Sequence, residues 1–336
     1  MFLTLLSGTT EGLLWALLAI GVYISYRILD MADLTCEGSV VLGGVVCGVL
    51  MWDHVNPILA ILIAFLAGCL AGCVSALLTT KLKIPPILSG ILTMLSLYTI
   101  NIRIMSLAIG RSGANSIGPN NPEGVSISDN TIFRATERAV ESIFGFLRDT
   151  LGWGFLPKDL TKNDVAIFVT AFVCILIIVI LYFLFGTEIG AAIRATGTNE
   201  KMCRAQGINT DTTKIIGLAL SNGLIAVSGA LLYQYNVSMD VNFGAGSIVI
   251  GLASIIIGEV VFMKAKNFFL KLLGIIVGSI IYRVIIAFII KETGEAQDVK
   301  LLSAAVVVLA LVLSTYGRQI VSSIGKKFKK EGKANG

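Results

Sequence analysis

The chain is divided into long apolar stretches that contain almost no charged residues. Runs of about 20 residues, such as 57–79 and 164–186, recur along the whole sequence. A helix of about 20 residues is about 30 Å long, which matches the hydrocarbon layer of a bilayer. A buried soluble core is also apolar, but it is not built from repeated runs of this length. The sequence therefore predicts an all-α fold, a polytopic bundle of membrane-spanning helices.

Composition supports this class. Hydrophobic residues make up 55% of the chain and charged residues 14%, about half of the charged fraction of a soluble domain. We expect one transmembrane domain over 1–336, with about eight or nine spans. One of them, 38–52, is short and glycine-rich, so it is either tilted with its flanks or broken. The predicted spans are 8–29, 38–52, 57–79, 85–107, 164–186, 214–233, 247–263, 268–290 and 299–317.

Lys and Arg gather in alternate connections between these spans. They lie at 81–83, 187–214 and 264–271, and in the basic tail 318–336. Basic connections face the cytoplasm, so we expect a cell-membrane protein with a cytoplasmic C-terminus. Nine crossings put the N-terminus outside, whereas a re-entrant 38–52 leaves eight crossings and puts it inside. The net charge of +5 is scattered between apolar spans, so the expected environment is a lipid bilayer and no nucleic-acid partner is expected.

The longest connection, 108–163, falls on the outer side in this scheme. Within it, apolar residues from Ile132 to Leu147 recur at helical spacing, with Arg134, Glu137 and Arg148 among the residues between them. This pattern predicts an amphipathic helix. It is either a helix that rests on the membrane or the bundle, or a docking surface for an external partner.

The chain lacks the residue constellations of an enzyme. It has no G-x-x-x-x-G-K-[ST] loop to bind nucleotide phosphates, and its single histidine is His54. Cys69 and Cys73 share a helix face, but no His or carboxylate accompanies them, so packing is the better interpretation than a metal site. The small-residue pairs Gly68/Gly72 and Gly274/Gly278 are likewise interpreted as packing surfaces. We expect no catalytic residue, no metal and no cofactor bound by this chain.

A polar segment, 187–210, carries the clearest functional pattern. Ile189, Ile193 and Thr196 form one short helical face that ends at Gly197. A second short helix over 199–206 begins with Asn199 as the expected N-cap and stops at Gly207. Two short helices under the membrane suit force transmission from a soluble partner, but on this physics alone an ordinary loop with surface helices fits as well.

The same segment resembles the cytoplasmic coupling motif of a family of importers. Arg194-Ala195, Gly197 and Asn199, followed by Gly207-Ile208-Asn209, resemble the motif of ABC-importer permeases in the branched-chain amino acid and simple-sugar permease superfamily. The resemblance continues through 217–223, 229–234 and 251–259, and upstream 33–39 and 98–105 look like the tryptophan/tyrosine-type branch. It implies that the following residues couple the chain to an ATPase: Glu188, Gly190, Arg194, Ala195, Gly197, Asn199 and Gly207.

The resemblance also implies partners. It implies a homodimeric pore, two cytoplasmic ABC ATPase subunits that hydrolyse ATP, and an extracytoplasmic substrate-binding protein. The expected cargo is an amino acid, aromatic or branched-chain, with a nucleoside or sugar as the alternative within the class. An ion-coupled secondary transporter would need intramembrane carboxylates and paired inverted halves, and neither is clear in the sequence. A membrane scaffold without transport activity is the third alternative.

Polar residues inside apolar spans are the candidates for the substrate pathway. Thr35, Glu37 and Ser39 precede or begin the short span, where helix amides could face a cavity; capping of a helix at the cytoplasmic surface fits equally. Arg283 either snorkels toward the outer interface or borders a wet vestibule. The remaining candidates, which should face the bundle interior or water, are Asn101, Arg103, Ser221 and Asn222.

Overall fold

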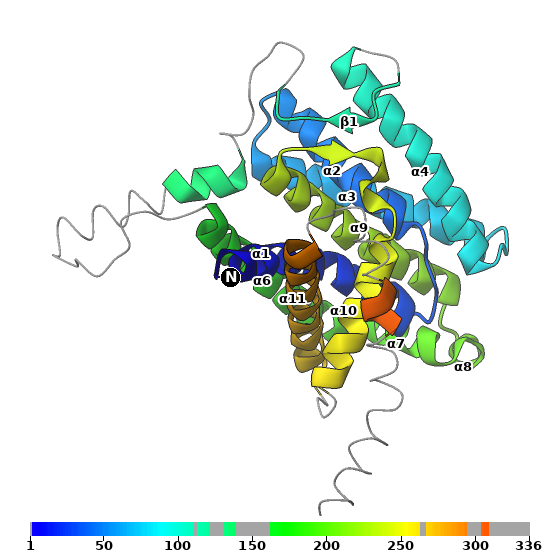
Figure 1. Cartoon of the computed structure of the whole chain (residues 1–336). Coiled ribbons are helices and arrows are strands. Elements are labelled where there is room, and N and C mark those ends of the chain that lie inside the picture. The colour runs from blue at the N-terminus through cyan, green and yellow to red at the C-terminus, as the bar shows by residue number, and fades with distance from the viewer. Residues whose placement is uncertain are drawn as a thin grey trace, which may run out of the picture.

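The chain folds into a bundle of long helices (Figure 1). The computed structural model describes residues 2–110, 113–120, 131–138, 162–262, 267–293 and 304–308. The first half contains α1 (Phe2–Tyr23), the π-helix η1 (Ile24–Ile28), α2 (Cys36–Trp52), α3 (Pro57–Thr80), α4 (Pro86–Ile109) and β1 (Ser116–Ile117). The second half contains α6 (Lys162–Gly186), α7 (Glu188–Thr198), α8 (Glu200–Ala205), α9 (Thr210–Asn236), β2 (Met239–Asp240), η3 (Val241–Gly244), α10 (Ser247–Val261) and α11 (Phe268–Thr293).

The predicted all-α membrane bundle is confirmed. Seven helices in the described part of the chain are long and apolar enough to cross a membrane, and α2 is a shorter apolar helix. Of the ninth predicted span, only 304–308 is described, and it is helical. The predicted amphipathic helix is helical over 132–138, while its continuation to Leu147 and the tail 318–336 lie outside the described residues.

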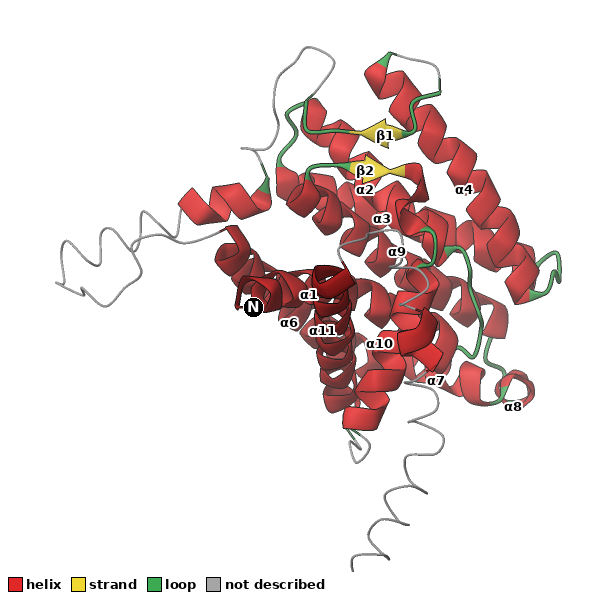
Figure 2. Ribbon diagram, in the orientation of Figure 1, coloured by secondary structure: helices red, strands yellow, loops and turns green. Residues whose placement is uncertain are grey.

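Two antiparallel helices, α1 and α9, form the centre of the bundle. The Ser221 hydroxyl donates to the Gly21 carbonyl and the Ser228 hydroxyl to the Leu14 carbonyl, both at 2.7 Å. The start of α1 therefore lies beside the end of α9. Figure 2 shows β1 paired with β2 on that side of the bundle, with α7 and α8 on the opposite side.

The short span is a broken helix, one of the two alternatives that the sequence allowed. After η1 the chain is irregular over 29–35, and Asp30 has a positive φ of 55°. The helix resumes at Cys36 and runs parallel to α9, because Ser39 contacts Asn222 and Gly48 lies against Tyr233 further along. The helix α2 therefore completes the crossing, and the re-entrant alternative is wrong.

A second broken span lies in the other half. From the end of α9 the chain runs through β2 and η3 before α10 begins at Ser247. The helix α10 runs parallel to α1, since Gly251 lies against Leu18 and Arg27 pairs with Glu259. Two half-length helices therefore lie on either side of the central pair.

The two halves repeat the same arrangement with opposite direction in the membrane. The offset between α2 and α10 is 211 residues (247 − 36), and that between α3 and α11 is also 211 (268 − 57). Contacts follow the same offset: Gly229 on α9 meets Val40 on α2, and Gly251 on α10 meets Leu18 on α1. The expectation that paired inverted halves are lacking is therefore wrong. The repeat is hard to recognise in the sequence, because the two halves correspond only at positions where helices pack against each other. The rest of each helix is apolar and of ordinary composition.

Close approach of backbones holds this bundle together. Gly68 faces Asn222 and Ala226 on α9, and Gly278 faces Ser254 and Gly258 on α10. Lipid chains are as apolar as the helices, so association in a membrane depends on such tight packing of small residues. The glycine pairs that the sequence suggested as packing surfaces do pack in this way.

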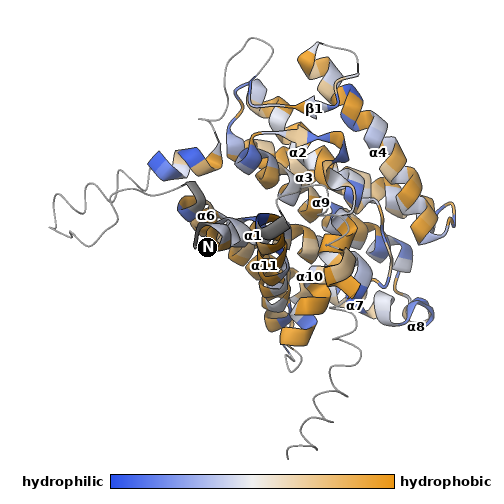
Figure 3. Cartoon of the chain, viewed as in Figure 1, coloured by the Kyte–Doolittle hydropathy of each residue, from blue (hydrophilic) through white to orange (hydrophobic). Residues whose placement is uncertain are grey.

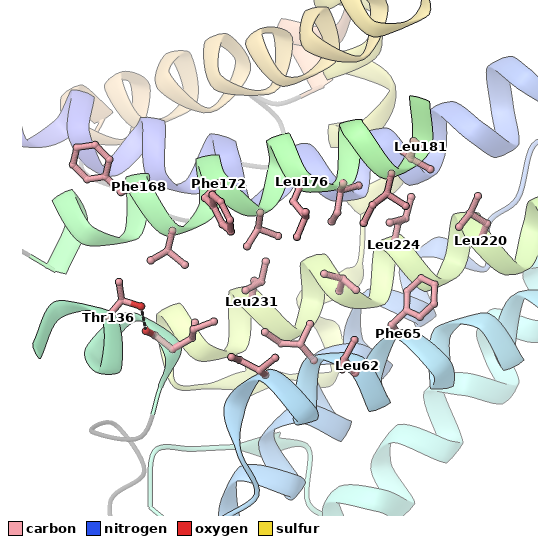
Figure 4. Close-up of a pocket in the computed structure, with 18 residues that line it drawn as sticks. Leu62, Phe65, Thr136, Phe168, Phe172, Leu176, Leu181, Leu220, Leu224 and Leu231 are labelled. Carbon is pink, nitrogen blue, oxygen red and sulfur yellow. Dashed lines mark hydrogen bonds between the residues drawn. The ribbon is translucent and has the colours of Figure 1, made fainter. Parts of the chain in front are cut away.

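Apolar residues predominate along the long helices (Figure 3), and many of them are exposed on the outside of the bundle, as expected for contact with lipid; examples are Leu66 on α3, Leu107 on α4 and Phe168 on α6. Between α3, α6 and α9 runs an open groove of about 700 Å³, lined almost wholly by aliphatic and aromatic side chains such as Leu62, Phe172 and Leu224 (Figure 4). Thr136, on the helix 132–138, is the one polar residue that lines it, and its hydroxyl donates to the Ile132 carbonyl. This groove therefore offers almost no hydrogen-bond partner to a polar ligand.

A methyl group added at Gly229 tests the packing of α2 on α9. The new Cβ of Gly229→Ala would collide with the Val40 carbonyl oxygen, a backbone atom that cannot move aside. Overpacking of this kind costs about 1–3 kcal/mol, so we expect a clear loss of melting temperature in detergent. Gly186→Ala is the matched control, because no atom lies within 4 Å of its new Cβ. Equal melting temperatures for the two variants would contradict the described packing.

Candidate functional site

The N-termini of the two half-helices meet at the centre of the bundle. The Glu37 carboxylate, in the first turn of α2, accepts a hydrogen bond from the Gly246 amide at the start of α10, at 3.0 Å. Gly244 approaches the backbone of Glu37 so closely that a Cβ there would collide with its carbonyl oxygen. Both helix ends carry partial positive charge, so a carboxylate placed between them is stabilised.

This junction lies near mid-membrane. Ser39 contacts Asn222, which is 12 residues along α9 from Thr210, or about 18 Å at about 1.5 Å per residue. The whole of α9, with 27 residues, is about 40 Å long. A backbone break at this depth needs protein partners for its polar groups.

Asp33 supplies those partners on the α2 side. One of its carboxylate oxygens accepts from the Thr35 amide at 3.0 Å and from the Ser75 hydroxyl at 3.3 Å. The other accepts from the Asn222 amide at 2.7 Å, and the Ser39 hydroxyl donates to the same Asn222 side chain at 2.7 Å. Asp33 is 6% exposed. The break, α2, α3 and α9 are thus joined through one buried carboxylate.

The structure separates the predicted pathway residues into groups. Ser39 and Asn222 belong to the Asp33 network, whereas Ser221 faces away from it toward α1. Thr35 is the N-cap residue of α2, but its side chain makes no capping bond and its hydroxyl has no hydrogen-bond partner in the described structure. Glu37 caps α10 inside the bundle, whereas the alternative that the sequence allowed was a cap at the cytoplasmic surface. The exposed Arg103 lies on α4 outside this network.

A cavity of about 140 Å³ opens beside Glu37, between α2, α4 and η3. Asn101 lines it and donates to the Gly38 carbonyl at 3.4 Å, while its side-chain oxygen is buried without a partner among the described atoms. The other lining residues are Gly38, Val41, Met94, Leu95, Tyr98, Val241, Asn242 and Ala245. The cavity therefore combines an acidic, polar end with an apolar wall.

Arg283 lies apart from this cavity in an ion pair that the sequence did not suggest. Its guanidinium group is 3.2 Å from the Glu11 carboxylate and lies 4.6 Å from the centre of the Trp15 ring. Glu259 pairs with Arg27 at 2.9 Å. Arg283 is thus held between α11 and α1, and its place in the substrate pathway stays a prediction.

The segment 187–210 folds as two short helices on the side opposite the β-strands. Thr187 caps α7, Asn199 caps α8 by accepting from the Met202 amide at 3.0 Å, and Gly207 ends α8 with a φ of 82°. Two of its glycines make close backbone contacts: Gly190 with Leu184 and Gly197 with the Ile28 carbonyl. Of the other predicted coupling residues, Glu188 and Arg194 are exposed and Ala195 is half-buried.

Charged side chains hold this segment to the start of α9. Arg204 pairs with Glu200 at 2.8 Å and with Asp211 at 3.1 Å, and the Lys214 ammonium lies 2.8 Å from Glu200. The hydrogen bond from Lys214 lowers the pKa of the Glu200 carboxyl, so this acid stays ionised at neutral pH. The Thr196 and Thr213 hydroxyls add a contact of 2.9 Å between α7 and α9.

The described residues contain no group of three or more metal-ligating side chains. What they do contain is a multi-pass helical bundle, a polar junction at mid-membrane and a compact polar segment at one end. These features are typical of membrane transport proteins.

The comparisons with known proteins give the family. The family described as the permease component of branched-chain amino acid transport systems matches residues 4–316, and this chain belongs to that family. A tyrosine transport system permease protein from Clostridioides difficile (strain R20291) is 36% identical over 91% of this chain and 90% of its own length. An uncharacterized protein from Rickettsia prowazekii (strain Madrid E) is 26% identical over 91% and 96%.

A probable branched-chain amino acid transport permease protein from Methanocaldococcus jannaschii is 28% identical over 45% of this chain and 47% of its own length. No solved structure matches the chain. The resemblance stated from the motifs is therefore confirmed at the level of the permease family.

Replacing Asn222 tests the Asp33 network. Asn222→Leu removes the donor to Asp33 and the acceptor for Ser39, and each buried polar group left unpaired costs about 1–3 kcal/mol. We expect a lower melting temperature in detergent and weaker accumulation in membranes. The control is Ser96→Ala on α4, where an exposed hydroxyl only contacts its own helix. A stability loss no larger than that of Ser96→Ala would show that the network is dispensable.

Proposed function

We propose that this chain is the permease subunit of an ABC importer, in the cell membrane with its C-terminus in the cytoplasm. The observation that carries the proposal is the placement of 187–210, called the coupling segment from here on. It forms two exposed helices beneath the bundle, and it touches the broken span directly. In this scheme the ATPase subunits bind and hydrolyse ATP, and this chain provides the path for the substrate.

The coupling segment has a mechanical route to the junction. Gly197 on α7 contacts the Ile28 carbonyl, at the end of η1. Five residues further, Asp33 holds α2 to α3 and α9. A movement of α7 driven by an ATPase therefore reaches the irregular segment 29–35 through a backbone contact. An irregular segment can change its dihedral angles without breaking a helix, which makes it a suitable hinge.

The remaining partners follow from the same scheme. A substrate-binding protein would deliver cargo on the side of β1, β2 and the helix 132–138. A second copy of the chain would complete the pore and cover exposed apolar side chains such as Leu88 and Leu92 on α4. The similarity to a tyrosine transport system permease supports an aromatic amino acid as the cargo, and a nucleoside or sugar is the alternative within this class.

One structural feature favours an ion-coupled transporter as the second candidate. Inverted halves and carboxylates at mid-membrane, here Asp33 and Glu37, are typical of secondary transporters. The two candidates differ in their energy source. Uptake of radiolabelled tyrosine into vesicles should require internal ATP and the binding protein. Uptake driven by an imposed ion gradient without ATP would favour the second candidate.

Crosslinking of the coupling segment tests the ATPase contact. Ile189 on α7 and Met202 on α8 are 54% and 52% exposed although both are apolar and lie in the coupling segment, and in this proposal the ATPase subunits cover them. We expect a cysteine-reactive crosslinker on Met202→Cys to capture the ATPase subunits, with a yield that changes between ATP-bound and nucleotide-free states. The control is Asp240→Cys, exposed on the opposite side of the bundle. No capture in any nucleotide state would rule out this coupling role.

A larger side chain at Gly197 tests transmission. Gly197→Val would push α7 away from Ile28. We expect the rate of tyrosine uptake to fall at least about tenfold while the ATPase subunits still bind. An increase of about 1.4 kcal/mol in the activation free energy is enough for this factor. The control is Thr198→Val, because the Thr198 hydroxyl only donates to the Arg194 carbonyl of its own helix. Normal uptake by Gly197→Val would contradict the proposed route.

A further inference from the structure

The cavity beside Glu37 contains polar groups that the fold itself does not use. The Asn101 side-chain oxygen is buried without a partner, in a residue that is 1% exposed. The Glu37 carboxylate accepts from backbone amides at the start of α10, those of Gly246 and Ile248, and no Lys or Arg in the described ranges pairs with it. Asp33 differs, because it does not line this cavity and donors from three other segments hold its two oxygens.

A carboxylate and an orphaned amide oxygen at mid-membrane depth do not face acyl chains. Ionisable groups at this depth pair with one another or line a water-filled cavity. Both groups line the same cavity, which opens on the exposed face of α4. In the pore that a second copy of the chain would complete, this cavity would face water, in contrast to the apolar groove between α3 and α6.

The Glu37 carboxylate and the orphaned Asn101 oxygen both accept hydrogen bonds, while the exposed Asn242 side chain adds an amide at the edge of the cavity. A group that suits a carboxylate and an amide oxygen together carries several N–H donors and a positive charge. A primary ammonium group has this chemistry, whereas a carboxylate or phosphate would be repelled by Glu37. Beside the acceptors, Met94, Leu95 and Tyr98 form an apolar and aromatic wall.

We propose that Glu37 and Asn101 bind the ammonium group of the transported amino acid, while Met94 and Tyr98 contact its apolar side chain. The inference rests on the proposed transport function and adds to it the group of the cargo that this site recognises. Half-helix amides commonly receive the carboxylate of a substrate; here Glu37 already occupies the amide at the start of α10, so the cavity presents negative charge instead.

Labelling of a cysteine in the cavity tests its charge. Tyr98→Cys, in the full-length chain in membranes, is treated with a cationic and an anionic methanethiosulfonate reagent, each rate normalised to that with free cysteine. We expect the cationic reagent to react about tenfold faster, the effect of one nearby charge in a partly hydrated site. Glu37→Gln in the same background keeps an acceptor for Gly246 and should reduce the ratio to about one. Asn101→Asp should raise it.

Two small molecules test the ligand. Tyramine has the amine and the aromatic ring of tyrosine but no carboxylate, and 3-(4-hydroxyphenyl)propionate has the carboxylate but no amine. We expect tyramine to slow the labelling of Tyr98→Cys and to lose this effect in Glu37→Gln, and we expect the acid to give no protection. Protection by the acid alone, or a charge preference that Glu37→Gln leaves unchanged, would overturn the proposal.

Two controls accompany the labelling of Tyr98→Cys. The unsubstituted chain gives the background from its own cysteines. Ile175→Cys, on the exposed apolar face of α6, should react with neither reagent if that face meets lipid.

Labelling requires no ATP hydrolysis, so its failure would leave the crosslinking result of Met202→Cys standing. Conversely, a correct charge preference without any ATPase capture would keep the ammonium site and remove the coupling role. No labelling of Tyr98→Cys by either reagent would show that the cavity is dry and would overturn the proposal.

Discussion

The interaction on which the rest of this structure depends is the pairing of backbone polar groups inside the hydrocarbon layer. A helix that stops at mid-membrane leaves amides without partners, and lipid offers none. Here the carboxylates of Asp33 and Glu37 accept from the amides of Thr35 and Gly246. Two acidic side chains thereby allow two spans to be irregular at the same depth. They also place two carboxylates near the centre of the bundle, and in the proposed function Glu37 would meet the cargo there.

The same breaks connect the ends of the molecule mechanically. Unbroken helices such as α3 move as rigid rods, whereas the segment between η1 and α2 can bend. It is contacted from below by α7 at Gly197 and from the side by α3 and α9 through Asp33. The hinge, the coupling segment and the polar cavity are thus parts of one continuous set of contacts. The ion pairs of Arg204 and Lys214 hold the coupling segment to α9, and in the proposed function this attachment would transmit force from the ATPase subunits to the bundle.

The sequence predicted the helical class, the spans and the coupling segment, because each depends on local signals: apolar length, capping residues and a terminal glycine. It indicated Ser39 and Asn222 as interior polar groups but not Asp33, the carboxylate that accepts from the Asn222 side chain. It also missed Glu11 as the partner of Arg283, since 272 residues separate them. Contacts across the bundle depend on which helix faces which, and near-uniform apolar composition carries little information about that. The inverted repeat escaped notice for the same reason.

The constant offset between the halves has a consequence for how the molecule could alternate. Two copies of one fold, inserted upside down with respect to each other, need not have the same internal shape. If each half adopts the conformation of the other, the assembly opens toward the opposite compartment. This exchange would require only packing arrangements that one of the halves already contains. The central pair α1 and α9 would then move little while the two halves exchange their conformations.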